Sequence, residues 1–509
     1  MRLSRLTASL EGVRVIVPES VATLDPDPEI TSIHYQSQTV LPGGLFSAIR
    51  GYSTDGHQFI EDAVKRGAKA VIADHPVETP VVVVMAGDTR KALASVSARF
   101  FQEPSRKLCL VGITGTNGKT TTAYLLEGIL RKAGLKTGVI TTVNYRYAGK
   151  VFDNPMTTPE SLDLQKILAE MVENGVTHAV MEVSSHAIDL DRVYACYFDL
   201  GVFTNLTQDH LDFHKDMETY WQAKKRFFME NLSTGPKATR AVAVINGNND
   251  RGRELLADCA LNKISVGRSE GNSVRPHDLK SGLDGIYGKI AIPSGHLSIH
   301  SSLVGAYNVE NILCAAGAGL GLNLSPSAIE AGINETSHIP GRLEAVPNAL
   351  GKFVYVDYAH TPDALENVLQ TLHELKTARI ICVFGCGGGR DKGKRKKMGE
   401  ISGRFADLSV ITTDNPRHEN PLDILWEIEK GVQKTAPHCF SVNDIRKGFP
   451  VKGYVMISDR ETAIGVSIEV ARAGDIVLIA GKGHETYQIV GNRTLPFDDR
   501  DLARKALRA

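Results

Sequence analysis

The chain has 509 residues, more than one ordinary hydrophobic core accommodates, and this length predicts about two to four domains. Lys plus Arg and Asp plus Glu number 58 each, so the formal net charge at pH 7 is zero. No global field therefore draws the chain toward nucleic acid or anionic lipid, and a charged ligand must be held by a local arrangement of side chains.

Residues 1–106 form the first block of the sequence. Short apolar runs at residues 70–73 and 81–84 predict strands, and residues 57–66 predict a helix. A turn-prone Glu-Pro-Ser stretch ends the block. We predict a small α/β domain over residues 1–106.

Residues 107–340 form the second block, which opens with an apolar run at residues 108–113 that is typical of a buried parallel strand. A glycine-rich loop follows, and then a pattern that predicts an amphipathic helix over residues 119–133. Strands and helices then alternate, the strands at residues 137–142, 178–183, 200–203 and 241–245 and the helices at residues 160–174, 217–230 and 308–319. The composition of residues 265–305 predicts a small β-rich segment. This alternation predicts a mostly parallel sheet with helices on both faces.

The third block, residues 341–509, repeats the alternation. Its predicted strands lie at residues 353–357, 379–384, 408–412, 455–458 and 476–480, and its predicted helices at residues 363–375, 421–434 and 462–473. We therefore predict an α/β protein of three domains, with a Rossmann-like domain at the C-terminal end.

The sequence also indicates where the protein resides. No window approaches the ~20 apolar residues of a membrane span, and the first 15 residues lack the apolar core of a secretory leader. The 7 cysteines are scattered, and no second pair lies near Cys382 and Cys386 to complete a zinc ribbon. We expect these cysteines to be small core residues of a cytoplasmic protein.

The glycine-rich loop predicts an ATP site. It comprises Gly115, Thr116, Asn117, Gly118, Lys119, Thr120 and Thr121. Glycines let the backbone approach phosphate closely, and the following helix directs its N-terminal amides at the anion. We expect Lys119 to bridge the β- and γ-phosphates and the Thr120 hydroxyl to bind Mg²⁺, although Ile113 stands where the strict phosphate-loop pattern has its first glycine.

Because such loops serve kinases, hydrolases and ligases alike, the reaction has to be inferred from other motifs. The loop is followed in order by Glu-Val-Ser-Ser-His at residues 182–186, Thr-Asn-Leu at 204–206, Asp-His-Leu-Asp at 209–212, Asn-Val-Glu-Asn at 308–311 and Asp-Tyr-Ala-His-Thr-Pro-Asp at 357–363. Together these motifs resemble the Mur ligases, the amino-acid-adding enzymes of peptidoglycan synthesis. The resemblance spans essentially the whole chain. It implies a UDP-substrate domain, a central ATP domain and an amino-acid domain that join a carboxylate to an amine through an acyl phosphate.

The resemblance also implies the residues that handle ATP and metal. Glu182 ends a buried strand at the edge of the sheet where α/β sites form, and with Thr120 and His210 it is the expected Mg²⁺ site. Lys224 matches a family lysine that is carbamylated and becomes a metal-binding anion, although Lys225 follows directly and a shift by one position stays open. Lys119, Lys224, His210 and Glu182 are the expected catalytic residues. Residues expected near adenine, ribose or phosphates are Asn308, Asn311, Arg342 and Asp357.

The nucleotide-sugar substrate has its own set of expected contacts. Around the muramoyl-dipeptide the resemblance implies Thr157, Thr158, Ser184 and Arg192, and around the UDP part it implies Ser37, Tyr52, Ser53 and Thr54. Arg192 is suited to a carboxylate because a guanidinium donates two parallel hydrogen bonds. The chain departs from the family in having Gln-Ser-Gln at residues 36–38 in place of Asp-Ser-Arg, which leaves the individual UDP contacts open.

The C-terminal motifs indicate the amine. Asp414, Asn415, Pro416 and Arg417, with Gly481 and Glu485, resemble the members that add meso-diaminopimelate to UDP-MurNAc-L-Ala-D-Glu. Diaminopimelate differs from lysine by a carboxylate at its far end, so a selective site needs a fixed cation there. Arg417 and Arg390 supply cations, and lysine-adding relatives usually lack an arginine at the Arg417 position.

Several alternatives stay open at this point. They are addition of L-lysine or another amine, a folylpolyglutamate-type synthetase, and a catalytically silent paralogue that keeps the fold. The basic run at residues 392–397 is interpreted as a solvated helix face, because no aromatic platform for nucleic acid accompanies it. We expect a monomer that binds no nucleic acid.

Overall fold

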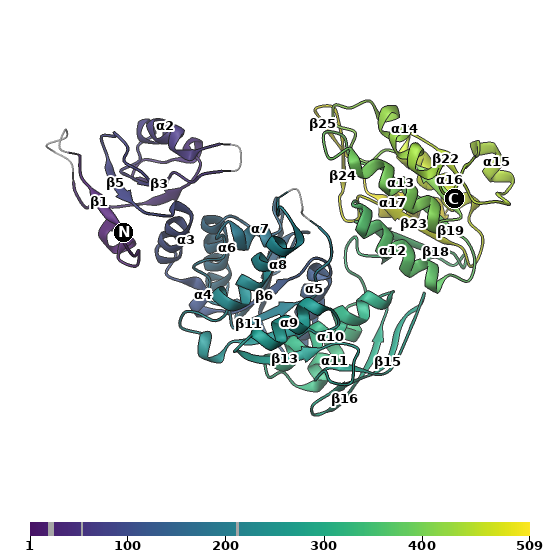
Figure 1. The fold of residues 1–509 in the computed structure, drawn as a ribbon, viewed down its shortest axis with the longest axis horizontal. Helices are drawn as coiled ribbons and strands as arrows, with labels where there is room; N and C mark the ends of the chain where they lie inside the picture. Colours follow the sequence, from purple (N-terminus) through teal and green to yellow (C-terminus); the bar gives the residue numbers. More distant parts are fainter. Residues whose placement is uncertain (19–24, 52–53, 210–212, 509) are drawn as a thin grey trace. The chain divides into compact units, whose positions relative to one another are not determined.

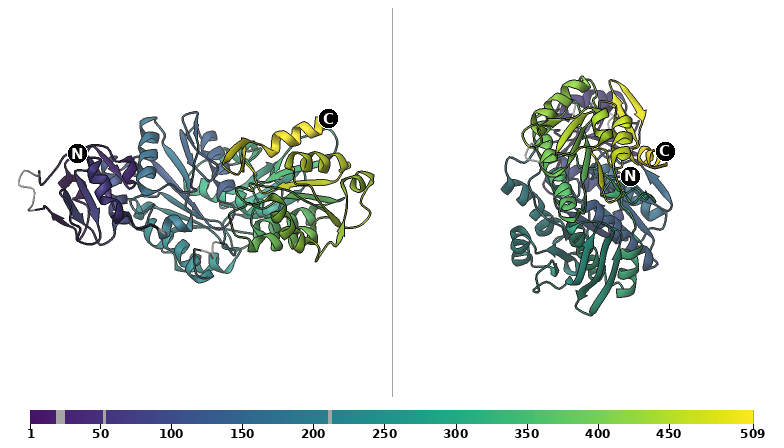
Figure 2. Two further views of the ribbon diagram at one scale, coloured as in Figure 1. Left: turned by 90° about the horizontal axis from the view of Figure 1, so that it is seen from above. Right: turned by 90° about the vertical axis from the view of Figure 1, so that its right-hand side faces the viewer.

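The computed structural model describes residues 1–18, 25–51, 54–209 and 213–508. The chain divides into two compact units (Figures 1 and 2). The first comprises Met1–Arg275 with Asn311–Gly332, and the second comprises Pro276–Glu310 with Ile333–Ala509. In the part of the chain that the structure describes, no helix is both long and apolar enough to cross a membrane.

A five-stranded sheet forms the N-terminal part of the first unit, in the order β1-β5-β4-β3-β2. Its strands are β1 (Arg14–Ile16), β2 (Ser32–His34), β3 (Gly44–Ser47), β4 (Ala70–Ala73) and β5 (Val82–Met85), and all neighbours are parallel except β1 and β5. Ala70 and Ile72 pack with helices α1 (Leu3–Thr7) and α3 (Thr89–Phe100), whereas Val71 packs with α2 (Ile60–Lys65) on the other face. Because β4 is buried on both faces, its sequence is continuously apolar.

The central sheet of the first unit has eight strands, in the order β13-β12-β11-β6-β10-β7-β8-β9. The strands are β6 (Cys109–Thr114), β7 (Thr137–Ile140), β8 (Tyr145–Tyr147), β9 (Lys150–Phe152), β10 (His178–Glu182), β11 (Leu200–Phe203), β12 (Val242–Asn246) and β13 (Asn262–Val266). The run from β13 to β7 is parallel, and β8 and β9 add an antiparallel edge. The helices before, between and after these strands are α4 (Pro104–Lys107), α5 (Lys119–Lys132), α6 (Ser161–Glu173), α7 (Ser185–Asp189), α8 (Met217–Arg226), α9 (Asp250–Asp258), α10 (Ala306–Gly321) and α11 (Pro326–Glu335).

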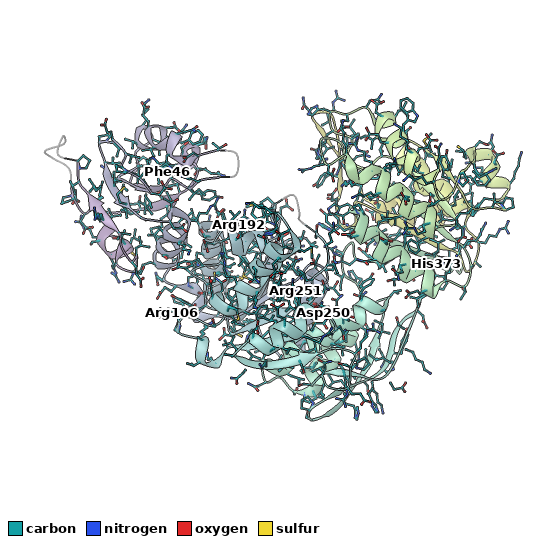
Figure 3. All side chains as sticks on the ribbon, viewed as in Figure 1. Phe46, Arg106, Arg192, Asp250, Arg251 and His373 are labelled. Carbon is teal, nitrogen blue, oxygen red and sulfur yellow. The ribbon has the colours of Figure 1, made fainter. Side chains whose placement is uncertain are left out.

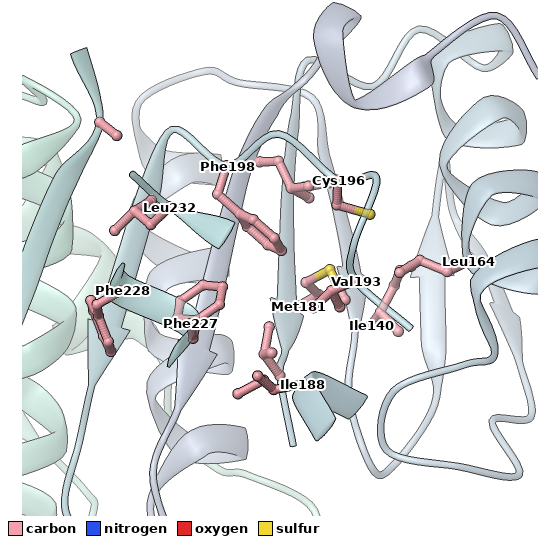
Figure 4. Close-up of a cluster of buried hydrophobic side chains, with 14 of the residues drawn as sticks. Ile140, Leu164, Met181, Ile188, Val193, Cys196, Phe198, Phe227, Phe228 and Leu232 are labelled. Carbon is pink, nitrogen blue, oxygen red and sulfur yellow. The ribbon is translucent and has the colours of Figure 1, made fainter. Parts of the chain in front are cut away.

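Two strand glycines let aromatic rings rest on this sheet. A Cβ at Gly112 of β6 would lie 2.5 Å from Phe227 Cζ, and one at Gly201 of β11 would lie 2.9 Å from Phe227 Cε1. Figure 4 shows Phe198, Phe227 and Leu232 in this buried cluster. The residues that carry these rings lie where the helix changes type. The helix predicted over residues 217–230 is α-helical as far as Arg226 and continues as a π-helical turn over Phe227–Asn231.

The second unit contains a three-stranded sheet and a seven-stranded sheet. The first is β14 (Arg275–Gly282), β15 (Gly285–Ile292) and β16 (Gly295–Ser301), in the region predicted to be β-rich. The larger sheet has the order β17-β18-β23-β19-β20-β22-β21, built from β17 (Glu344–Ala345), β18 (Phe353–Asp357), β19 (Ile380–Phe384), β20 (Leu408–Ile411), β21 (His438–Cys439), β22 (Gly453–Met456) and β23 (Ile476–Ala480). Only the β17–β18 pair is antiparallel among the paired strands.

Helices cover both faces of the seven-stranded sheet. One face carries α12 (Pro362–Leu375), α13 (Gly393–Phe405) and α14 (Pro421–Val432), and the other carries α15 (Val442–Lys447), α16 (Arg460–Val470) and α17 (Asp499–Arg508). A hairpin of β24 (Tyr487–Val490) and β25 (Arg493–Pro496) precedes α17. The predicted α/β class with Rossmann-like alternation is confirmed.

Two predictions about individual residues are wrong. Arg395 does not belong to a solvated helix face: its side chain is 1% exposed and its guanidinium pairs with Glu419 and Glu427 at 3.0 and 2.9 Å. Cys439 is exposed on an edge strand rather than part of the core, while Cys196, Cys259, Cys314, Cys382 and Cys386 are buried as expected.

Candidate active site

The phosphate loop connects β6 to α5. Gly115 and Gly118 have φ angles of 146° and 84°, in the region that favours glycine. Added Cβ atoms would collide with Thr204 Oγ1 at Gly115 and with Asn311 Oδ1 at Gly118, so both polar side chains lie directly against the loop. Asn205 fixes it further, because its backbone oxygen accepts from Thr116 N at 2.9 Å and its Oδ1 accepts from Asn117 N at 2.9 Å.

Lys119 is held over the same loop. Its Nζ donates to Gly115 O at 3.0 Å and to Thr116 O at 2.7 Å. The cation therefore lies above the backbone that would cradle phosphate, where it can pair with phosphate oxygens.

Glu182 lies at the carboxyl end of β10, which pairs with β6. Its carboxylate is buried and accepts from Thr120 Oγ1 at 2.8 Å, Thr142 N at 3.0 Å and Thr142 Oγ1 at 3.1 Å. Thr142 Oγ1 also lies 3.1 Å from Thr157 Oγ1. This set of carboxylate and hydroxyl oxygens is the donor chemistry that Mg²⁺ prefers, and it joins the loop to the strand end.

Lys224 reaches the phosphate loop from α8. Its Nζ donates to Gly115 O at 2.9 Å, and the side chain is 1% exposed. Burial lowers the pKa of Lys224 well below its ordinary value, and the nearby Lys119 lowers it further while Asp209 opposes the shift. The neighbouring Lys225 instead pairs with Glu254 at 2.9 Å on the surface of the unit.

The residues expected around the dipeptide converge beside Glu182. Thr158 Oγ1 donates to Glu182 O at 2.9 Å and accepts from Ser184 N at 3.1 Å. Arg192, labelled in Figure 3, donates from Nη1 to Thr158 O at 3.1 Å. Its Nε lies 3.4 Å from Glu160 Oε2, so a cation suited to a substrate carboxylate is held at the site by an acidic partner.

Arg90 of α3 contacts Glu160, and the sequence did not indicate this ion pair. Its Nη1 lies 3.3 Å from the same Glu160 oxygen that faces Arg192. The two arginines and one buried carboxylate thus form a cluster with a surplus of positive charge. Nothing in the sequence around Arg90 marks it, because Glu160 is 70 residues away.

The expected uridine contacts receive less support. Ser37 is buried in the turn η1 (Ser37–Thr39), whereas Thr54 is exposed and its carbonyl accepts from Gly51 N at 2.8 Å. Tyr52, Ser53 and His210 lie outside the described residues.

In the second unit, Asp357 ends β18 beside the start of the third sequence block. Its Oδ2 accepts from Leu343 N at 2.6 Å and its Oδ1 from Ala359 N at 2.8 Å. Burial raises the pKa of Asp357, and the nearby Arg342 opposes this shift. Arg342 also lies over the Tyr358 ring at 5.3 Å, and Asn308 Nδ2 donates to Val304 O at 2.8 Å.

The expected amine-binding motifs meet at the carboxyl edge of the seven-stranded sheet, after β20 and β23. Asn415 Nδ2 donates to Glu485 Oε2 at 3.0 Å, and a Cβ at Gly481 would lie 3.6 Å from Asp414 Oδ2. Lys482, which the sequence analysis did not single out, is fully buried between them. Its Nζ donates to Glu485 Oε2 at 2.9 Å and to Asn415 Oδ1 at 3.2 Å.

Arg417 adopts an unusual backbone conformation for a residue with a side chain, with a φ of 51°. Its N donates to Ile489 O at 3.1 Å and its O accepts from Gly491 N at 2.7 Å, so the β24–β25 hairpin fixes it on both sides. The guanidinium donates from Nη1 to Gly388 O at 2.9 Å, and a Cβ at Gly388 would collide with Pro416 O. Arg390 is exposed in the adjoining loop.

Comparisons with known proteins agree with this geometry. Three family models match the chain: "Mur ligase family, catalytic domain" over residues 29–107, "Mur ligase middle domain" over residues 113–319, and "Mur ligase, glutamate ligase domain" over residues 341–483.

Individual relatives cover nearly the whole length. A protein of Geobacter metallireducens described as UDP-N-acetylmuramoyl-L-alanyl-D-glutamate–2,6-diaminopimelate ligase is 46% identical over 98% of each chain, and one of Geobacillus kaustophilus with the same description is 41% identical over 95% of this chain and 96% of its own. A solved structure of a ligase with that description superposes with a TM-score of 0.68 at 30% identity, covering 94% of this chain and 95% of the other.

Proposed function

The chain belongs to the Mur ligase family, and we propose that it adds meso-diaminopimelate to the D-glutamate side-chain carboxylate of UDP-MurNAc-L-Ala-D-Glu with consumption of ATP. The product is UDP-MurNAc-tripeptide for peptidoglycan synthesis. The observation that carries the proposal is that a phosphate loop, with Glu182 and Lys224 against it, occurs in the same chain as the Arg417 and Glu485 motifs.

The first unit supplies the groups that activate the carboxylate. Phosphorylation converts a carboxylate oxygen into a leaving group, so catalysis consists largely of positioning and of neutralising phosphate charge. Lys119 and the loop amides bind the ATP phosphates, and Arg192 binds a substrate carboxylate. We propose that Thr120, Glu182, His210 and Lys224 hold Mg²⁺, which supplies neutralisation of the phosphate charge when bound.

Lys224 is proposed to act as its carbamate. Forming a carbamate requires the neutral amine, and burial lowers the pKa of Lys224 in the direction that provides it. The carbamate would turn a buried amine beside Lys119 into an anion suited to a metal. The position of Lys224 Nζ at the loop supports this residue rather than Lys225.

The remaining residues proposed to contact ATP are Gly115, Thr116, Asn117, Gly118, Thr121, Asn308, Asn311, Arg342 and Asp357. Ser37, Tyr52, Ser53 and Thr54 are proposed for the UDP part, and Thr157, Thr158 and Ser184 for the dipeptide.

The second unit supplies the amine site. Arg417 and Arg390 are proposed to bind the distal carboxylate of diaminopimelate, and Asp414 and Glu485 to accept from its ammonium. A site built to pair a charged group rejects an analogue that lacks the group by as much as ~10⁴-fold. L-Lysine, the alternative amine, lacks that carboxylate and would leave the Arg417 guanidinium without an anionic partner.

Arg417→Ala and Arg446→Ala provide a matched test. Arg446 lies on α15 and pairs with Glu469 on the surface, away from the proposed motifs in sequence. We expect Arg417→Ala to raise KM for diaminopimelate and to lower tripeptide formation while ATP binding is retained, and Arg446→Ala to behave as the wild type. Equal kinetics of the two variants would contradict the assignment of Arg417.

Three further statements belong to the proposal. The domains are expected at residues 1–106, 107–340 and 341–509, and the protein is expected to be a cytoplasmic monomer. Light scattering of the purified chain at working concentration tests the monomer, because a dimer would double the measured mass.

A further inference from the structure

A group of metal-binding side chains lies in the N-terminal sheet, outside the residues of the proposed ligase reaction. His57 lies in the turn η2 (Gly56–Phe59), and Asp74 and His75 directly follow β4. One potential ligand atom from each of these three residues lies within 4.8 Å of the other two. We call His57, Asp74 and His75 the histidine cluster.

The ring of His57 is oriented as in a metal-binding histidine. Its Nδ1 lies 2.6 Å from Asp55 Oδ1, which also accepts from His57 N at 3.0 Å. Donation from Nδ1 to Asp55 leaves the lone pair on Nε2, which accepts from Asp74 N at 3.3 Å, and a metal ion at Nε2 would replace this hydrogen bond. A histidine that binds metal almost always donates its other ring nitrogen in this way, often to a carboxylate.

One distance in the cluster equals the separation of two ligands on a tetrahedral ion. His57 Nε2 lies 3.3 Å from Asp74 Oδ1. Two ligands of a tetrahedral Zn²⁺ at bond lengths of about 2.0 Å are separated by about 3.3 Å. His75 Nδ1 lies at a hydrogen-bond distance of 2.6 Å from the same Asp74 oxygen, so the half-exposed His75 ring has to turn for both residues to bind one ion. The centroids of the two imidazole rings lie 4.3 Å apart.

The net charge of the groups around the cluster also favours a bound cation. Asp55 and Asp74 carry two negative charges, and the guanidinium of Arg50 lies against them, with its Nε 3.1 Å from Asp74 Oδ2. Arg50 also donates to Asp74 Oδ1 at 3.3 Å, but its side chain is 62% exposed and can move away. With neutral histidines these groups sum to one negative charge.

We propose that the histidine cluster binds Zn²⁺ through His57 Nε2, Asp74 Oδ1 and a ring nitrogen of His75, with water as the fourth ligand. Two imidazoles and one carboxylate select zinc over magnesium, which prefers an all-oxygen shell. The ion joins the segment after β3 to the segment after β4. This site goes beyond the proposed ligase function and does not depend on it.

The test is zinc binding to the full-length chain in saturating Mg²⁺, which occupies the oxygen site at the phosphate loop. Calorimetry counts the bound Zn²⁺, and the visible absorption of added Co²⁺ reports imidazole ligands. We expect one site in the wild type and its loss in His75→Ala, a change at a half-exposed side chain that leaves the fold intact. Asp55→Ala should weaken binding by about 10- to 100-fold, as for other partners of metal-bound histidines. Arg50→Ala should strengthen it.

His277 and His296 provide the matched control. Their rings also face each other, with centroids 4.4 Å apart, on exposed positions of β14 and β16. Replacing both with alanine should leave zinc binding unchanged. Absence of zinc uptake by the wild type, or uptake that is the same in His57→Ala and His75→Ala, would overturn the proposal.

Discussion

The buried pair of Arg460 and Asp499 provides a sharp test of how the amine-binding edge is supported. Both side chains are 0% exposed, and the guanidinium contacts the carboxylate at 2.8 and 2.7 Å. Its Nη1 also donates to Thr413 O at 3.1 Å and its Nη2 to Ala480 O at 3.0 Å. These carbonyls directly precede the Asp414–Arg417 and Gly481–Glu485 segments.

The expected loss of unfolding free energy depends on which buried groups each substitution leaves unpaired. Arg460→Met leaves Asp499 buried without its partner and two carbonyls without a donor. Breaking a buried pair on one side costs about 3–5 kcal/mol of unfolding free energy. Replacing both partners, as in Arg460→Met with Asp499→Leu, removes the buried charge altogether and should restore most of that loss.

Denaturant unfolding of the full chain measures these changes, with the exposed pair of Arg446 and Glu469 as the control. That pair has side chains 47% and 53% exposed, so Arg446→Met should cost no more than about 1 kcal/mol. Because the chain has more than one unit, the comparison uses the midpoint of the transition that shifts. Equal shifts for Arg460→Met and Arg446→Met, or a double variant less stable than the single one, would refute the reasoning.

Three other predictions concern the proposed catalytic groups. Glu182→Gln should lower turnover on the order of 10²-fold at saturating Mg²⁺ in a phosphate-release assay, because the cation site loses its charge and geometry; unchanged turnover would contradict the metal role. Carbon-13-labelled bicarbonate should give a carbamate NMR signal in the wild type and in Lys225→Ala but not in Lys224→Ala, and a signal that survives in Lys224→Ala would reject the assignment. Burial, with Arg342 adding to it, lowers the pKa of His484 from 6.5 to about 4, so its stability contribution is present above pH 6.5 and is lost as pH falls toward 4. The loss is at most about 3 kcal/mol, and His484→Gln should flatten the pH dependence of the unfolding midpoint in that window.

Strands buried on both faces were predictable from the sequence to within one or two residues. The bounds of β4, β11, β18 and β23 coincide with the predicted runs, because a strand in the interior of a sheet is built mostly from apolar side chains. Edge strands carry no such signal: all three residues of β1 are exposed. Helix α3 was not predicted, although the sequence contains its N-cap residue. Asp88 accepts from Arg90 N at 2.9 Å and from Lys91 N at 3.1 Å.

The site was predictable where its residues lie in one motif and not where distant segments meet. The phosphate loop is recognisable as a single motif, and the family resemblance named Lys224, whose hydrogen bond to Gly115 O only the structure shows. The burial of Lys482 was not predicted, because the sequence does not show that Asn415, 67 residues away, lies beside it. Arg395 was misjudged for the same reason, since its partner Glu427 lies 32 residues along the chain.

The central claim is the identity of the amine, and a wild-type assay tests it most directly. Phosphate release is measured with ATP, Mg²⁺ and UDP-MurNAc-L-Ala-D-Glu, with meso-diaminopimelate or L-lysine as the amine, and the product is identified by mass. We expect kcat/KM for meso-diaminopimelate to exceed that for L-lysine by as much as ~10⁴-fold. Equal values for the two amines, or a preference for L-lysine, would contradict the role assigned to Arg417.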